Sequence, residues 1–256
     1  MIRSEFALEV NELTVSYGGL LAVSGVSINV APGEVVGLIG PNGAGKTSLI
    51  DAVTGFTSSR GRINVDGVSV DGLSAHRRTR LGLSRTFQSV ELFDDLTVSE
   101  NLMVAASDPT WWSPIVHMIA PNFGRANGAV DVQWALDAVG LSAIGSSLPT
   151  SLSHGQSRLV GVARALVRRP KAILLDEPAA GLDTQESRLL GARIKEIAGT
   201  GIGVLLVDHD MGLVLSTCDR ISVLDFGEII AVGTPIEIRS DKRVLEAYLG
   251  TSRSGT

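Results

Sequence analysis

Residues 40–47, which read GPNGAGKT, have the glycine, lysine and threonine spacing of a loop that binds phosphate groups. Glycines let the backbone wrap closely around an anion, and the first amides of a following helix would point at it. Lys46 can bridge two phosphates of a nucleotide, and the Thr47 hydroxyl can ligate Mg²⁺. The residues that we expect to contact ATP are Gly40, Pro41, Asn42, Gly43, Ala44, Gly45, Lys46, Thr47 and Ser48.

The flanking residues supply the elements that such a loop needs. Residues 34–40 read EVVGLIG, a nearly continuous apolar run that is typical of a strand buried on both faces. A pattern that favours a helix begins at Lys46. The alternative is a glycine turn beside a surface lysine, but the strand before the loop and the helix after it favour a phosphate site.

Two carboxylates follow a second apolar run. Residues 172–175 are apolar and lead directly into Asp176, Glu177 and Pro178. Ligands of open α/β sheets bind at the carboxyl ends of the strands, where these acids would lie. Asp176 can hold Mg²⁺, usually through water, and Glu177 can polarise an attacking water as a general base. The alternative is a pair of exposed acids at a strand end.

A third stretch, LSHGQ at 152–156, precedes a run with helical periodicity. Ser153 and Gln156 have the spacing of a capping box at a helix start. We expect the helix to end near Arg168 and Arg169, which suit its negative end, before Pro170. A cap needs no ligand, yet a serine hydroxyl can accept from an amide and still donate to a phosphate oxygen.

Buried strands that alternate with helices indicate an α/β core with a parallel sheet. Residues 203–207 are a further buried strand, and 184–199 are a helix with Asp183 as N-cap, Glu186 at its third position and Gly199 as its stop. Alternating residues at the beginning of the chain predict antiparallel, half-exposed strands, so the sheet system is expected to be mixed.

Composition limits the possible classes of protein. The 256 residues carry a net charge of −5 and a pI of about 5.4, which do not favour a nucleic-acid-coating protein. The single cysteine, Cys218, cannot form an internal disulfide. No stretch has the ~18 apolar residues of a membrane span, and Pro109, Pro114 and Pro121 interrupt the longest uncharged region.

Together these motifs resemble those of an ATP-binding-cassette (ABC) ATPase over essentially the whole chain. The phosphate loop, Gln88, LSHGQ, AILLDEP, GLD at 181–183 and His209 occur in the order of that family. The resemblance implies a P-loop NTPase fold with a mixed sheet, an antiparallel β subdomain and an inserted α-helical subdomain. It implies one domain over about 1–250, with the core at about 1–88 and 169–250, the helical subdomain at about 89–168, and a disordered tail at 251–256.

The resemblance also implies roles for further residues. Two such domains would sandwich two ATP molecules head to tail. Tyr17 would stack on adenine, Gln88 would sense Mg²⁺ and the attacking water, and His209 would contact the γ-phosphate. Contacts to ATP from the opposite subunit would come from Ser153, Gly155, Gln156 and Asp183. His154 stands where the commonest signature of the family has glycine, a departure that is found in several importer branches.

Finer details resemble the larger ATPase subunit of branched-chain, or hydrophobic, amino-acid importers. They include GLSRTFQ, LTVSENL, EPAAGLD, LLVDHDM, the C-terminal residues 231–250 and an insertion near 107–128 that contains Trp111, Trp112 and Phe123. This implies a peripheral protein on the cytoplasmic face of the cell membrane, with two permease subunits, a second ATPase subunit and, indirectly, an extracytoplasmic binding protein as partners. A urea or short-amide importer is the alternative, and a soluble ABC ATPase is a weaker one.

Overall fold

The computed structural model describes residues 4–87, 91–107 and 125–249. The expectations for Gln88, for the insertion with Trp111, Trp112 and Phe123, and for the tail at 251–256 lie outside these residues. Strands of the described residues form two sheets. The bounds of the strands are β1 Leu8–Tyr17, β2 Leu20–Val30, β3 Val35–Ile39, β4 Arg60–Val65, β5 Val68–Ser69, β6 Leu83–Arg85, β7 Ala172–Asp176, β8 Gly203–Val207, β9 Arg220–Asp225 and β10 Glu228–Gly233.

The larger sheet has the strand order β10-β9-β3-β8-β7-β6 and is mixed, as the sequence predicts. Strands β9, β3, β8, β7 and β6 run parallel to their neighbours, whereas β10 pairs antiparallel with β9. The smaller sheet has the order β2-β1-β4-β5, and all of its pairs are antiparallel. Strands β3 and β8 are buried at every position, which explains their uniformly apolar sequences.

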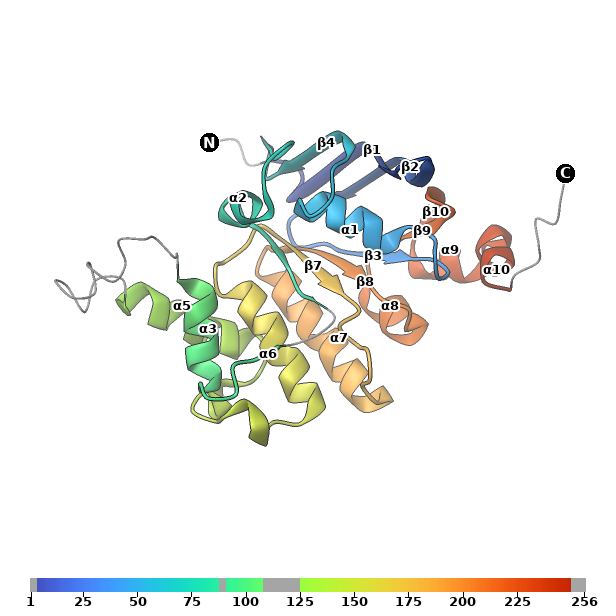
Figure 1. The fold of residues 1–256 in the computed structure, drawn as a ribbon. Helices are drawn as coiled ribbons and strands as arrows, with labels where there is room; N and C mark the ends of the chain where they lie inside the picture. Colours follow the sequence, from blue (N-terminus) through green and yellow to red (C-terminus); the bar gives the residue numbers. More distant parts are fainter. Residues whose placement is uncertain (1–3, 88–90, 108–124, 250–256) are drawn as a thin grey trace, which may run out of the picture.

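Helices cover the larger sheet and form a separate group at one side (Figure 1). Within the described residues, none of them is long and apolar enough to cross a membrane. The helical bounds are α1 Lys46–Thr54, α2 Ala75–Arg80, α3 Val98–Ala106, α5 Arg125–Ala138, η1 Ser142–Ile144, η2 Pro149–Ser151, α6 His154–Leu166, α7 Thr184–Gly199, α8 Met211–Thr217, α9 Pro235–Ser240 and α10 Lys242–Leu249.

Two apolar clusters lie on opposite faces of the larger sheet. Alternate residues of β3 point to the two sides, so Val36 packs with the smaller sheet and α1, whereas Val35 packs with the helices α6 and α7. The cluster that contains Val35 extends into α3 and α5, so it connects the helical group to the sheet. These packed layers hold the ends of the central strands in fixed positions.

One predicted helix end is confirmed and another is wrong. Helix α7 ends at Gly199, as predicted, with Thr200 as its C-cap. Helix α6 ends at Leu166. Arg168 donates from Nε to the carbonyl of Ala105 and from Nη2 to that of Ser107, so it binds the end of α3 rather than of its own helix. The sequence around Arg168 suggested that it binds the end of its own helix, because the local pattern contains no information on the neighbouring helix α3.

Candidate functional site

Three parallel neighbours, β3, β8 and β7, end at the same edge of the larger sheet. Val207, the last residue of β8, pairs with Leu38 of β3 on one side and with Asp176 of β7 on the other. The phosphate loop, His209 and Glu177 follow directly after these three strands. The fold therefore gathers residues from three separate sequence regions at the edge where α/β sheets bind ligands.

Close backbone contacts explain two glycines of the phosphate loop. A Cβ on Gly45 would lie 2.4 Å from the carbonyl oxygen of Ala22, and φ of Gly45 is 105°. A Cβ on Gly40 would lie 2.0 Å from the carbonyl oxygen of Leu224. At Gly43, with φ 82°, no atom of the described part of the chain lies within 4 Å of the added atom. The loop is thus packed against the sheet at both ends and open in its middle, as a phosphate cradle requires.

Helix α1 begins at Lys46 without a side-chain cap and without an acidic residue in its first turn. In contrast, α3, α6, α7 and α9 each begin with a complete capping box. The first amides of α1 are therefore left for a ligand, and the positive end of the helix favours an anion. The structure thus has an uncapped helix start at the position where the sequence predicts phosphate binding.

The ammonium group of Lys46 stays close to the loop. It donates to the carbonyl oxygens of Gly40 at 2.6 Å and of Pro41 at 3.0 Å. Burial lowers the pKa of Lys46, while Glu177 and Asp176 act in the opposite direction. The ammonium group of Lys46 is partly removed from water, and the two carboxylates favour its charged form. A charged ammonium group at this place suits the binding of phosphate groups.

Glu177 has an unusual backbone conformation at the end of β7. Its φ is 46°, a value that is uncommon for residues other than glycine, and its amide donates to the carbonyl of Val207 at 2.7 Å. Nδ1 of His209 lies 3.7 Å from Oε1 of Glu177 and 3.7 Å from Oδ1 of Asp208. Strained residues held by surrounding structure concentrate at functional sites, which supports a role for this carboxylate.

Asp208 is a residue that the sequence reasoning missed. Its side chain is fully buried, and its two oxygens accept from the amides of Ala179 at 3.0 Å and Asp210 at 2.9 Å. It therefore fixes the backbone that follows Glu177 to the backbone that carries His209. The signal was available, because a charged residue directly after an apolar run at 203–207 marks a strand end at the ligand edge.

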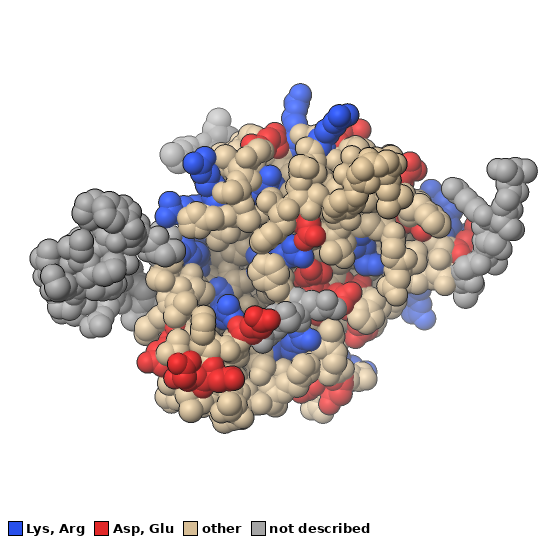
Figure 2. Space-filling view, in the orientation of Figure 1, with Lys and Arg blue, Asp and Glu red and all other residues tan. Residues whose placement is uncertain are grey.

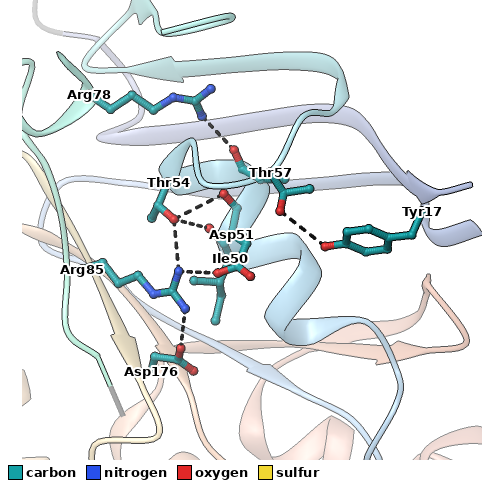
Figure 3. A network of polar contacts seen from close by, with 9 residues as sticks. Tyr17, Ile50, Asp51, Thr54, Thr57, Arg78, Arg85 and Asp176 are labelled. Atoms are coloured by element: carbon teal, nitrogen blue, oxygen red, sulfur yellow. Dashed lines mark hydrogen bonds and ion pairs between the residues drawn. The ribbon is translucent and has the colours of Figure 1, made fainter. Parts of the chain in front are cut away.

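Asp176 faces a second missed residue, Arg85 of β6 (Figure 3). Nη2 of Arg85 lies 2.8 Å from Oδ2 of Asp176, and Nη1 lies 2.6 Å from Oδ1 of Asp51 in α1. The amide of Asp176 also donates to Oγ1 of Thr86 at 3.1 Å. Only one oxygen of Asp176 is engaged in the ion pair with Arg85, and the side chain stays 14% exposed.

Tyr17 ends β1, in the hairpin with β2. The residue is 48% exposed, and its hydroxyl lies 3.4 Å from Oγ1 of Thr57 (Figure 3). The same hairpin carries Ala22, whose carbonyl contacts Gly45 of the phosphate loop. An exposed aromatic ring on a hairpin that packs against this loop fits the predicted stacking on a nucleotide base.

The predicted capping boxes are confirmed at two helix starts. Ser153 accepts from the amide of Gln156, whose side chain accepts from the amide of Ser153, and Asp183 caps α7 with Glu186 in the same way. The two starts are in contact, because a Cβ on Gly155 would lie 2.7 Å from Oε1 of Glu186. Ser153 and Asp183 are both exposed.

His154 joins these two segments. Its Nε2 lies 3.3 Å from the carbonyl oxygen of Ala180, and a Cβ on Gly181 would lie 2.9 Å from the same nitrogen. The departure from glycine at position 154 therefore does not displace the helix start; the ring lies on the loop before α7.

A groove of about 310 Å³ separates the sheet side from the helical group. Exposed Phe56 and Phe87 line it on the sheet side, with Arg85, and Arg164 and Arg168 line it on the helical side. Lys and Arg side chains are visible on this side of the molecule, below the place of α2 (Figure 2). The groove therefore combines exposed aromatic rings with arginine side chains.

Comparisons with known proteins identify the family. The ABC transporter family matches residues 23–180, and the branched-chain amino acid ATP-binding cassette transporter family matches residues 228–253. The chain is 40% identical to the high-affinity branched-chain amino acid transport ATP-binding protein BraF of Pseudomonas aeruginosa, over 95% of this chain and 97% of that protein. It is also 40% identical to the protein of the same description, LivG, of Escherichia coli K12, over 96% of this chain and 99% of that protein.

A solved ATP-binding cassette of an ABC transporter in its ADP conformation has the same fold. It superposes with a TM-score of 0.83 at 29% identity and covers 96% of this chain and 100% of that chain. The resemblance that the motifs indicate and the predicted fold class are thus confirmed. The chain belongs to the ABC transporter family of ATP-binding-cassette ATPases.

Proposed function

We propose that this ATPase powers a membrane importer of branched-chain or other hydrophobic amino acids from the cytoplasmic face of the cell membrane. The observation that carries the proposal is the full-length identity of 40% to two ATP-binding proteins of branched-chain amino acid transport. The family match at 228–253, over β10 to α10, supports the same branch. A urea or short-amide importer would use the same ATP chemistry and is an outcome of the test below.

Hydrolysis would rest on the carboxylate of Glu177. It follows β7 at the ligand edge and lies 3.7 Å from Nδ1 of His209. Glu177 would accept a proton from the attacking water, and His209 would orient toward the γ-phosphate. Lys46 and the uncapped start of α1 would bind the phosphates. Tyr17 would hold the base, so binding and chemistry would use different parts of the edge.

The donor set suits Mg²⁺. This ion prefers oxygen ligands, keeps several waters and is held by one or two protein groups together with substrate phosphates. Thr47 provides a hydroxyl in the first turn of α1, and Asp176 has one oxygen outside its ion pair with Arg85. No group of three or more acidic, histidine or cysteine side chains that could hold a metal occurs in the described residues. When bound, Mg²⁺ would neutralise charge on the phosphates, and Gln88 would complete the set.

A second subunit would complete each site. Ser153 and Gly155 begin α6, and Asp183 begins α7, at two exposed helix starts that contact one another. Each cap satisfies part of its helix start, while the serine hydroxyl keeps a proton to donate. We propose that this surface, with Gln156, contacts the ATP that is bound to the opposite subunit, in a pair of this chain with itself or with a related chain.

The groove between sheet and helices supports docking of a permease segment. The exposed rings of Phe56 and Phe87 offer apolar contact, and Arg164 and Arg168 bring positive charge to the groove. Arg85 belongs to the groove wall and to the ion pair with Asp176, so the groove reaches the catalytic edge. Two membrane-spanning partners would each receive one ATPase subunit in this way.

Affinity purification of the Glu177→Gln variant from native membranes, with ATP present, tests the proposal. The expected result is co-purification of two polytopic membrane proteins and a second cassette. The associated binding protein should bind leucine or valine. Binding of urea instead would move the chain to the alternative importer. Recovery of ribosomal or DNA-repair proteins, with no membrane partner, would contradict the transport role and leave the ATPase chemistry intact.

A further inference from the structure

The guanidinium group of Arg85 connects helix α1, which carries Thr47, with strand β7, which carries Asp176. Nη1 of Arg85 contacts Oδ1 of Asp51 at 2.6 Å, and Nη2 contacts Oδ2 of Asp176 at 2.8 Å. Asp51 lies four residues after Thr47 in α1 and therefore on the same face of the helix. The two-pronged guanidinium of Arg85, the fork, thus bridges helix α1, which carries the Thr47 hydroxyl, and strand β7, which carries the Asp176 carboxylate.

The surroundings of Arg85 hold this fork in place. Its side chain is only 9% exposed, and Nε is buried without a hydrogen-bond partner among the described residues. Phe87 and Phe56 lie beside the guanidinium, with ring centres 5.1 Å and 5.8 Å from Cζ. Burial of a charged group without full satisfaction is costly, so the arrangement needs a compensating role.

We propose that Arg85 is a positioning residue for ATP hydrolysis: it sets the separation between Thr47 and Asp176 and so shapes the metal site between them. The proposal rests on the proposed ATPase site. By holding one oxygen of Asp176, Arg85 turns the other toward the position of the phosphates. By holding Asp51, it fixes the rotation of α1, which carries the Thr47 hydroxyl.

Geometry rather than charge distinguishes this role. A guanidinium presents two parallel donors to two carboxylates, whereas an ammonium group is a point charge that cannot span both. Arg85→Lys therefore keeps the net charge beside Asp176 and removes only the bridge. Asp51→Asn removes the charge at the opposite end of the bridge and leaves Arg85 with Asp176, so it weakens the same fork without touching the proposed site residues.

Arg169→Lys is a matched control. Like Arg85, Arg169 lies over an aromatic ring, that of Trp134 at 4.0 Å, but it pairs with a single carboxylate, that of Asp131, at 2.9 Å. The experiment measures Mn²⁺ binding in the presence of ADP by electron paramagnetic resonance, ADP binding in the presence of a chelator, and thermal unfolding of the nucleotide-free protein. Steady-state ATPase activity is measured beside these three.

In Arg85→Lys and in Asp51→Asn we expect half-saturation by Mn²⁺ to need about tenfold more metal, with an altered resonance spectrum. Metal-free ADP affinity should stay within about threefold, and the ATP turnover number should fall by about tenfold or more. Arg169→Lys should match wild type in all four. Wild-type metal affinity and spectrum in Arg85→Lys would overturn the proposal. An equal loss of metal-free ADP affinity would also overturn it, because Arg85 would then support the phosphate loop as a whole.

The two failures can be told apart. If the wild-type chain neither binds Mn²⁺ with ADP nor hydrolyses ATP, the proposed site itself fails. If wild type does both and the bridge variants behave like Arg169→Lys, only the role of Arg85 fails.

Discussion

Nδ1 of His209 lies 3.7 Å from Oε1 of Glu177, although the two residues follow different strands of the larger sheet. The distance is too long for a hydrogen bond and short enough for attraction when the imidazole is protonated. Buried Asp208 fixes the backbone on both sides of this pair. The relationship therefore brings a carboxylate and an imidazole close together at the ligand edge.

Glu177→Gln should keep ATP binding and lower the turnover number by at least about a hundredfold, because an amide cannot accept the proton of the attacking water. His209→Gln should cost less, since Glu177 remains. Single-turnover hydrolysis and equilibrium ATP binding separate the two effects. Turnover at the wild-type rate in Glu177→Gln would remove the general-base assignment.

Lys46→Ala should weaken ATP binding by about a hundredfold, because the phosphates lose a charged donor at the start of α1. The change also removes the hydrogen bonds to the carbonyls of Gly40 and Pro41. Lys171→Ala is the matched control, since this lysine is exposed and pairs with Asp66 at 3.4 Å on the surface. Titration with a fluorescent ATP analogue measures both. Equal affinities for the two variants would contradict the phosphate-loop assignment.

Ser153→Arg should abolish turnover without weakening ATP binding to the monomer, because its bulk would meet the ATP of the opposite subunit. Thr234→Arg is the control, since Thr234 caps α9 with the same kind of capping box. Each change should cost about 1 kcal/mol of stability through the lost cap. ATPase activity as a function of protein concentration reports the effect. Full turnover in Ser153→Arg would reduce this residue to a cap.

Local patterns were sufficient for the elements that carry the site. The apolar run before Gly40 predicted β3, and the spacing of Ser153 with Gln156 and of Asp183 with Glu186 predicted two capping boxes that the structure contains. These features depend on residues within one turn or one strand, so a sequence reading reaches them.

Contacts between distant segments were not predictable in the same way. Arg85 meets Asp176 because the three-residue strand β6 pairs with β7. A strand of this length has too few residues to reveal a period, and nothing near position 85 indicates its partner.

Because Cys218 is buried, the protein is expected to lose stability at alkaline pH. Removal from water raises the pKa of its thiol from 9.0 to about 12, with a further contribution from Asp219 and an opposing one from Lys195. The unfolded chain therefore releases the proton near pH 9, while the folded chain keeps it. The stabilisation is complete below pH 9 and is lost as the pH rises toward 12.

Between pH 8 and pH 10, wild type should lose about 1.4 kcal/mol of unfolding free energy relative to Cys218→Ala. Urea unfolding of both proteins at the two pH values measures this difference, in which the other titrating groups cancel. The alanine variant also removes the contact of the thiol with Gly37, where a Cβ would lie 2.9 Å from Sγ. That loss is a packing effect and is the same at both pH values. Parallel pH dependence of the two proteins would show that the thiol ionises as readily in the folded chain as in the unfolded one, which its 7% exposure argues against.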